Sequence, residues 1–498
     1  MPDHIEIETT YSVDTRTRLP DLADLAPGGM EESTHELDAT YYDTDALSLA
    51  ARRITLRRRT GGTDAGWHLK IPWGPDAKRE FHAPLGRDTD TVPAELARLA
   101  ASAVRGEPLR PVARISTRRT EYELRDTAGE SLALVADDTV TGEATTTTAW
   151  REVEIELASG GRELQHDIGR RLTSAGATPS ATGSKLLTVL GDRVPPPVPR
   201  PRGDTAGDVV LAYLWDQVEH LLTHDPKVRL DEPDAVHQMR VATRRIRAVL
   251  QVFPSVLDRG STRQVADELR DLAGVLGLAR DLEVLRDRCE RWIDDLPERV
   301  AGHRPTDTWL RAVDDHRAAE MERITEELSG PRYFALLEAL DRLRADPPLT
   351  EAAHREARPV LSDDLLGACR RMSAAHDRAV AAEDADTRLT AWHDVRKAAK
   401  RARYAATLAA PVLGKRAKRV RTWACGLQEV LGEHQDGVAL RTYLDEHAPT
   451  LVEAGDHDDG VLVTLGAVAG AEVVRGEALI DEAARVWSSG PDPRHPLA

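Results

Sequence analysis

The sequence contains few cysteines and few aromatic residues. Among its 498 residues are only 3 cysteines, Cys289, Cys369 and Cys425. This odd number of widely separated cysteines, without C-x-x-C spacing, argues against a disulfide framework and predicts reduced, buried thiols. Aromatic residues make up 4% of the chain, which is too few for the base-stacking platforms typical of RNA-binding proteins.

The chain also lacks targeting and membrane-spanning segments. It opens without the basic and apolar regions of a secretory signal, and no apolar run approaches the length that crosses a membrane. We therefore expect a soluble, cytoplasmic protein with no membrane partner. The formal net charge of −17 opposes non-specific binding to nucleic acid, but binding at a defined site depends on local potential.

A cationic helical pattern occurs twice in the second half of the sequence. In each copy a histidine and three cations recur at i, i+3, i+7 and i+10, which places them on one stripe of a helix. The members are His237, Arg240, Arg244 and Arg247 in the first copy and His393, Arg396, Lys400 and Arg403 in the second. A row of donors without acceptors suits an extended polyanion.

A second similarity follows each copy at nearly the same offset, because residues 276–286 resemble residues 431–441. Two matches with one spacing predict a duplicated helical unit. Apolar residues cover the opposite face of each cationic helix, so each helix can pack on a bundle while it presents its cations. A solvated basic surface is the alternative interpretation. A third basic segment, which contains Lys415 and Arg419, is expected to extend the binding surface.

A Pro-rich segment, 194–204, separates two halves of different character. Before it, short alternating segments end in Gly or Asp turns, as in antiparallel strands; after it, long stretches have helical periodicity. We predict a β domain at 1–193, a semi-rigid linker at 194–204 and a helical domain at 205–490. The expected fold class is α+β and multi-domain, with an antiparallel β tunnel or barrel followed by an all-α duplicated bundle.

Charged residues alternate with apolar residues in the β half. Glu6 and Glu8, then Arg57 and Arg59, and then the acids of 152–156 occupy every second position, so each set shares one face of a strand. A solvated outer face of a sheet would give the same pattern. A polar barrel interior would instead hold a divalent cation with its carboxylates and phosphates with its guanidinium groups.

These residues resemble two known families. The first half resembles the CYTH domains, or triphosphate tunnel metalloenzymes, which include thiamine triphosphatases, inorganic triphosphatases and class IV adenylate cyclases. Motifs in the order of that family are Glu6-Ile7-Glu8, Tyr41-Tyr42-Asp43-Thr44, Leu56-Arg57-Arg58-Arg59, Gly66 to Lys70, Arg79-Glu80, Thr117 to Tyr122, Asp137-Asp138, Arg151 to Glu156 and Ser184-Lys185-Leu186. The second half resembles the CHAD domain, a helical bundle considered to bind inorganic polyphosphate.

The resemblance implies functional residues. The catalytic set would be Glu6, Glu8, Arg57, Arg59, Lys70, Glu80, Arg119 and Lys185. The ligands of Mg²⁺ or Mn²⁺ would be Glu6, Glu8, Asp138, Glu152 and Glu154. Polyphosphate would bind His237, Arg240, Arg244, Arg247, His393, Arg396, Lys400, Arg403, Lys415 and Arg419. Arg118 and Asp137 remain alternatives to Arg119 and Asp138, because adjacent strand residues face opposite sides.

One position departs from the CYTH pattern. Thr10 stands where the motif E-x-E-x-K has its lysine, which is expected to weaken hydrolysis more than binding. The leading hypothesis is metal-dependent hydrolysis of inorganic triphosphate or short polyphosphate, with long polyphosphate bound by the helical domain. One alternative is a non-catalytic polyphosphate-binding protein at polyphosphate granules. Another is a nucleoside triphosphatase or adenylate cyclase, although no feature indicates an adenine pocket. Homo-oligomerisation remains open.

Overall fold

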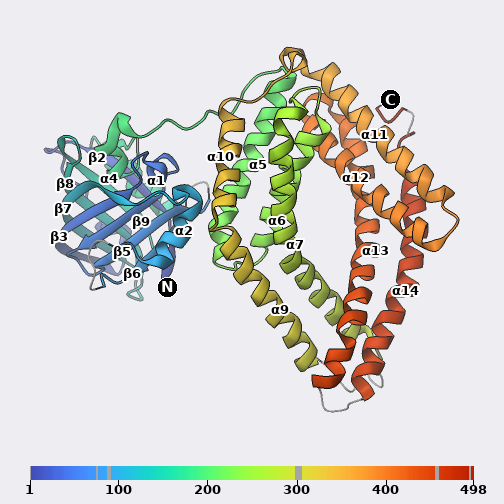
Figure 1. The fold of residues 1–498 in the computed structure, drawn as a ribbon. Helices are drawn as coiled ribbons and strands as arrows, with labels where there is room; N and C mark the ends of the chain where they lie inside the picture. Colours follow the sequence, from blue (N-terminus) through green and yellow to red (C-terminus); the bar gives the residue numbers. More distant parts are fainter. Residues whose placement is uncertain are drawn as a thin grey trace. The chain divides into compact units, whose positions relative to one another are not determined.

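A computed structural model describes residues 2–74, 77–86, 91–297, 306–454, 459–492 and 495–497 of the chain. The chain forms two compact units, Met1–Pro197 and Val198–Ala498. The first contains an antiparallel sheet and the second is helical, as Figure 1 shows. This confirms the predicted fold class. Among the described residues, no helix is both long and apolar enough to cross a membrane.

The first unit is built on one sheet of 10 strands in the order β1-β6-β5-β4-β3-β7-β8-β9-β2-β10. The strands are β1 (Asp3–Glu6), β2 (Glu8–Val13), β3 (Gly29–Asp43), β4 (Thr55–Thr60), β5 (Gly66–Pro72), β6 (Lys78–Ala83), β7 (Arg110–Arg125), β8 (Ser131–Glu143), β9 (Thr147–Leu157) and β10 (Thr178–Pro179). The helices of this unit are α1 (Ser48–Ala51), α2 (Ala94–Val104), α3 (Arg162–Ser174) and α4 (Lys185–Leu190), with the 3₁₀ turns η1 (Ala23–Leu25) and η2 (Gly191–Arg193).

The sheet closes on itself through its first two strands. Only Ile7 separates β1 from β2, yet β1 pairs with β6 and β2 pairs with β9. Because the line of paired strands returns to the same stretch of chain, the sheet forms a tunnel and leaves few free edges.

Apolar and charged residues alternate along the strands, but the charged residues face the inside of the tunnel, whereas in an ordinary half-exposed sheet they face solvent. On β9, Val153 and Ile155 are fully buried and pack with Ile168 and Leu172 of α3. On β8, Val140 lies on the same face as Asp138 and packs with apolar residues of α4, the helix that begins at Lys185. The helix α3 therefore covers an apolar outer face, α4 packs against the tunnel face, and the charged residues that alternate with Val153 and Ile155 lie inside the tunnel.

The second unit is a helical bundle. Its helices are α5 (Ala206–Arg229), α6 (Ala235–Val252), α7 (Arg259–Asp295), α9 (Thr306–Glu327), α10 (Pro331–Ala345), α11 (Ala357–Ala381), α12 (Ala385–Leu413), α13 (Lys415–Ala454) and α14 (Asp459–Ser488), with the 3₁₀ turn η3 (Glu351–His354). The two predicted cationic helices are α6 and α12, which pack against each other. Their predicted apolar faces enter one core, where Met239, Ile246, Val395 and Ala402 have no exposed surface.

Candidate functional site

The tunnel contains a cavity of about 310 Å³ lined by charged side chains from β1, β2, β4, β5, β6, β7 and β9 and from the start of α4. All eight predicted catalytic residues line it: Glu6, Glu8, Arg57, Arg59, Lys70, Glu80, Arg119 and Lys185. Of the other predicted metal ligands, Glu154 also lines the cavity, and Asp138 and Glu152 contact Lys185. The sequence pattern therefore identified side chains that the fold brings together.

Lys70 is the central cation at one end of the cavity. Its Nζ lies 2.6 Å from Glu6 Oε2 and 3.8 Å from carboxylate oxygens of Glu8 and Glu80. Burial disfavours the charged ammonium, but the three carboxylates outweigh it and raise the pKa of Lys70. Burial and the neighbouring Glu80 raise the pKa of Glu6 to about 8, even though Lys70 opposes that shift. Glu8 also contacts Lys78, whose Nζ is 2.5 Å from its Oε1.

Glu80 is surrounded by positive charge and hydrogen-bond donors. Its Oε1 lies 2.8 Å from His68 Nδ1 and 3.6 Å from an Arg57 nitrogen. Burial would raise the pKa of Glu80, but Lys70, His68 and Arg57 together hold it well below its usual value. The other ring nitrogen of His68 is 2.9 Å from the backbone oxygen of Asp64. Glu80 is therefore an ionised carboxylate in a fixed orientation.

A second acidic group surrounds Lys185. The Lys185 Nζ lies 2.8 Å from Asp138, 2.7 Å from Glu152 and 2.6 Å from Glu154. Arg119 donates to both carboxylate oxygens of Asp138, at 2.8 and 2.7 Å, and to Glu154 at 2.5 Å. Although burial opposes it, Lys185 and Arg119 lower the pKa of Glu154 far below its usual value. Burial raises the pKa of Glu152.

The structure distinguishes the adjacent candidates that the sequence left open. Arg119 and Asp138 face the tunnel, and the Asp138 side chain is completely buried. Arg118 is 70% exposed and lies beside Glu36, whereas Asp137 pairs with Arg151. Adjacent strand residues point to opposite faces, so each pair contributes one member to the interior.

Arg59 is the least neutralised cation in the cavity. Its pKa is lowered to about 9, first by burial and then by the like charges of Arg57 and Arg119. Its guanidinium contacts Asp64, but its Nε is buried and makes no hydrogen bond among the described residues. A buried cation with unused donors favours an anionic ligand.

In the helical unit, α6 and α12 bring their cations to one place. Burial lowers the pKa of Lys400, and the like charges of Arg396, Arg244 and Arg240 lower it further, to about 7. The Nε atoms of Arg244 and Arg396 are buried and donate no hydrogen bond to any described residue. We call Arg240, Arg244, Arg396, Lys400 and Tyr404 the basic cluster.

The second repeated motif supports this cluster. Arg240 donates to Asp281 at 2.8 Å. Its guanidinium lies over Gly277, 3.5 Å from the position that a Cβ would occupy there. Arg396 passes over Gly432 in the same way and is attracted by Asp436. Each arginine therefore lies beside a glycine of the following helix, and each aspartate supplies a counter-charge.

The comparisons with known proteins follow this division of the chain. A CYTH domain model matches residues 4–186 and a CHAD domain model matches residues 212–445. An uncharacterized protein of Mycobacterium tuberculosis (strain ATCC 25618 / H37Rv) is 40% identical over 481 residues, covering 91% of this chain and 90% of that protein. The chain belongs to the CYTH–CHAD family. The counterpart in strain CDC 1551 / Oshkosh matches with the same identity and coverage.

Similar solved structures cover one domain each. PptA from Streptomyces chartreusis is 21% identical with a TM-score of 0.46, over 57% of this chain and all of that one. The CHAD domain from Ricinus communis is 23% identical with a TM-score of 0.47, over 58% of this chain and 94% of that one. An adenylyl cyclase-like protein from Hippeastrum, described as having a dominant triphosphatase activity, is 15% identical with a TM-score of 0.25. The match covers 37% of this chain and 94% of that one.

The CYTH family is metal-dependent, and the tunnel holds two groups of side chains that fit an ion. Asp138, Glu152 and Glu154 form an all-oxygen group, the ligand type that Mg²⁺ and Mn²⁺ accept. Glu6 belongs to the other group with Glu80 and His4, whereas its predicted partner Glu8 contacts Lys70 and Lys78. The sequence linked Glu6 to Glu8 by spacing and did not identify His4.

In the CHAD domain the predicted residues differ in their surroundings. His393 Nδ1 lies 3.0 Å from Gln435 Oε1. Burial lowers the pKa of His237, and the nearby charge of Arg280 lowers it further. Arg247 lies near Arg270 and Arg401, beyond the basic cluster. Lys415 and Arg419 are exposed at the start of α13, about 20–25 Å along the helix from Gly432 at 1.5 Å per residue.

Three residues in or beside the basic cluster were not identified as functional from sequence. Tyr404, interpreted as core packing, is 6% exposed, but Arg244 and Arg403 act on its hydroxyl and lower its pKa although burial opposes this. Asp281 and Asp436 were recognised only as part of a repeat. Cys425 also differs from the expected buried thiol, because it is partly exposed beside Arg403 and Glu429, while Cys289 and Cys369 are buried.

Proposed function

We propose that the CYTH domain hydrolyses inorganic triphosphate or short polyphosphate with Mg²⁺ or Mn²⁺, and that the CHAD domain binds long polyphosphate. One observation carries the first part: the tunnel cavity combines buried guanidinium and ammonium groups with a group that fits a cation, formed by His4, Glu6 and Glu80. Phosphate oxygens match the cations, and a divalent ion matches the carboxylates. A neutral or cationic substrate would leave the Nε donor of Arg59 unused and its repulsion from Arg57 and Arg119 unrelieved.

In the proposed reaction the protein contributes positioning and charge. A divalent ion bound in the tunnel would neutralise phosphate charge and lower the pKa of a water. Arg57 and Arg59 would bind phosphate oxygens from β4, and Lys70 would do so from β5. Lys185 and Arg119 hold the second acidic group in place, so its oxygens are ordered before any ligand arrives.

The test is phosphate release from triphosphate, ATP and long polyphosphate, each with Mg²⁺, with Mn²⁺ and with a chelator. We expect metal-dependent release that is fastest from triphosphate. ATP is included because a neighbouring cavity of about 480 Å³, lined by Thr10 and Arg162, also adjoins Glu6 and Glu8. Preference for ATP would favour nucleotide chemistry over the proposal.

A non-catalytic role is the second candidate, and Thr10 is the observation that favours it. Thr10 is buried on β2 directly opposite Glu154 of β9, where the CYTH motif has a lysine. A threonine supplies no charge to bind phosphate or orient a water. Triphosphate binding without any phosphate release would establish this candidate and refute hydrolysis.

The basic cluster carries the second part of the proposal. Its four cations, Arg240, Arg244, Arg396 and Lys400, lie near Asp281 and Asp436, and burial together with the like charges of the three arginines lowers the pKa of Lys400 to about 7. A polyanion would relieve this repulsion and use the free Nε donors. Long polyphosphate fits because it can contact many cations at once.

A further inference from the structure

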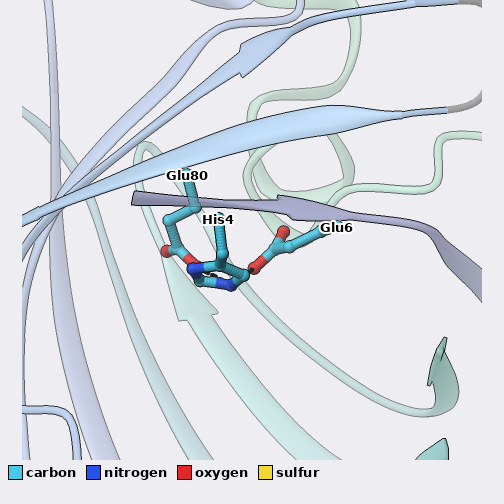
Figure 2. A group of neighbouring side chains, drawn as sticks. All are labelled: His4, Glu6 and Glu80. Carbon is cyan, nitrogen blue, oxygen red and sulfur yellow. Dashed lines mark ion pairs between the residues drawn. The ribbon is translucent and has the colours of Figure 1, made fainter. Parts of the chain in front are cut away.

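His4 lines the tunnel cavity, and its side chain is 57% exposed. It is two positions before Glu6 on β1, so both side chains point to the same face. The strand register places His4 directly opposite Glu80 of β6. Figure 2 shows the three side chains, from these two neighbouring strands, directed toward one another. Their ligand atoms all lie within 4.8 Å of one another.

We propose that His4, Glu6 and Glu80 form a binding site for a divalent transition-metal ion such as Mn²⁺ or Zn²⁺, with one imidazole nitrogen and two carboxylate oxygens as ligands. The site deepens the proposed metal-dependent function, since it names a nitrogen ligand and a preferred class of metal. Metal binding at this place does not itself require hydrolysis.

The orientation of the two carboxylates supports the site. Glu6 Oε2 is held by Lys70 at 2.6 Å, and its other oxygen lies 3.3 Å from His4 Nε2. Glu80 Oε1 is held by His68 at 2.8 Å, and its other oxygen lies 3.7 Å from His4 Nε2. Each carboxylate therefore uses one oxygen on the tunnel wall and directs the other toward the imidazole. Such outer contacts are typical of oriented metal ligands.

The spacing of the three atoms fits an ion. Ligands about 2.1 Å from a common metal lie about 3.0 Å apart in an octahedral site and about 3.4 Å apart in a tetrahedral one. The two His4 distances, 3.3 and 3.7 Å, need only small side-chain adjustments to match. The side chains of Glu6 and Glu80 are 2% and 7% exposed, whereas that of His4 is 57% exposed. Water can therefore reach the open coordination positions from the His4 side.

The ligand set also predicts which metal binds. Imidazole nitrogen favours transition ions, and Mg²⁺ prefers oxygen ligands and retains its waters. Asp138, Glu152 and Glu154 offer only oxygen, the ligand type that Mg²⁺ prefers, but an ion there has to displace the Lys185 ammonium, which lies 2.6 to 2.8 Å from all three. His68 cannot replace His4 as a ligand, because Glu80 and the Asp64 carbonyl oxygen already occupy both of its ring nitrogens.

The test uses the untagged full-length protein, freed of metal with a chelator and then loaded with one equivalent of Mn²⁺. Pulsed electron paramagnetic resonance should detect ¹⁴N modulation from a coordinated imidazole. The modulation should disappear in His4→Ala and in His4→Gln, and Mn²⁺ affinity by calorimetry should fall at least about tenfold. Zn²⁺ should displace the bound Mn²⁺ far more readily than Mg²⁺ does.

The matched control is His35→Ala, which removes another tunnel histidine, one that lies 3.6 Å from Glu121. It should leave the ¹⁴N modulation unchanged. Absence of modulation in the wild-type protein, or its persistence in both His4 variants, would overturn the site. If modulation is present but no phosphate is released from triphosphate, the metal site stands and the proposed hydrolysis fails. If phosphate is released with no ¹⁴N modulation, only the His4 site fails.

Discussion

At the scale of single residues, the tunnel holds charged groups whose state depends on their neighbours. Glu6 and Glu80 are adjacent buried carboxyls, yet their pKa values move in opposite directions. Burial dominates at Glu6 and raises its pKa to about 8. At Glu80, Lys70, His68 and Arg57 outweigh burial and lower the pKa. Two close carboxyls that cannot both ionise easily are suited to accept a divalent cation.

The double variant Glu6→Gln/Glu8→Gln should lose metal-dependent phosphate release, because it removes two carboxylates from the tunnel wall. The fold should survive, since an amide is close in shape to a carboxyl. Phosphate release and the midpoint of thermal unfolding measure the two effects. Unchanged turnover would contradict the metal role.

Thr10→Lys tests the departure from the CYTH motif. The new ammonium would lie opposite Glu154 on the tunnel face of β2, near the proposed phosphate site. We expect kcat to rise more than KM changes, because the added contact acts mainly in the transition state. Steady-state kinetics of triphosphate hydrolysis measure both constants. If the wild-type kcat is already high and Thr10→Lys does not raise it, the threonine does not weaken hydrolysis. Thr9→Lys, on the opposite face of the strand, is the control.

Lys400 gives a pH dependence to polyphosphate binding. Its pKa in the free protein is about 7, and a bound polyanion would raise it. At a pH between the pKa of the free protein and that of the complex, binding therefore takes up a proton. Affinity should therefore fall as pH rises above about 7, by at most about tenfold per pH unit. Below that pH, Lys400 should contribute no pH dependence. Calorimetry across pH 7 to 9 measures this. Lys400→Arg should remove this pH dependence. If the affinity of that variant falls with pH as steeply as the wild-type affinity, Lys400 is not the group that titrates.

At the scale of elements, two pairs of helices build the basic cluster. Each cationic helix is followed by a long helix that supplies a glycine beneath the arginine and an aspartate beside it. The rigid bundle holds these cations together before a ligand binds. Pre-organised positive charge reduces the cost of ordering side chains on binding.

The variant Arg240→Ala/Arg244→Ala/Arg396→Ala/Lys400→Ala should lose most affinity for long polyphosphate. Stability should change little, because the variant removes mutually repelling charges and leaves the apolar faces of α6 and α12 intact. Wild-type affinity should also fall steeply with salt as counterions are released. Binding isotherms at several salt concentrations measure both effects.

The matched control removes four exposed cations elsewhere on the bundle, Arg259, Arg263, Arg358 and Arg378. It changes the net charge equally and should retain most of the affinity. Equal losses in the two variants would mean that only overall charge matters and that no defined cluster binds the chain.

At the scale of the whole molecule, the chain is two compact units, Met1–Pro197 and Val198–Ala498, with the Pro-rich segment at their boundary. Each unit has its own apolar clusters, so each can fold by itself. The proposed activities are likewise separate: hydrolysis in the first unit and capture of long polyphosphate in the second.

Residues 1–197 and 198–498, produced as two proteins, should each unfold cooperatively in calorimetry. The first should hydrolyse triphosphate as the full chain does, and the second should bind long polyphosphate. On dilute long polyphosphate the full chain should release phosphate faster than the mixed halves, because tethering raises the local substrate concentration. Equal rates would show that the two domains act independently.

The sequence by itself determined the class of each half and identified charged residues that the fold gathers in the tunnel, whose catalytic and binding roles stay predictions. Strand and helix periodicities separate the two halves, and i, i+2 spacing places Glu6 and Glu8, or Arg57 and Arg59, on one face. Duplication of the cationic stripe could be recognised because helix spacing is local.

Only the tertiary structure decided which of these charges meet. Glu6 lies with Glu80, 74 positions along the chain, because the closed sheet pairs β1 with β6. The choice of Arg119 over Arg118 depends on the register of β7, and the low pKa of Lys400 depends on α6 packing against α12. Cross-strand and interhelical contacts depend on register and closure, which local spacing does not contain.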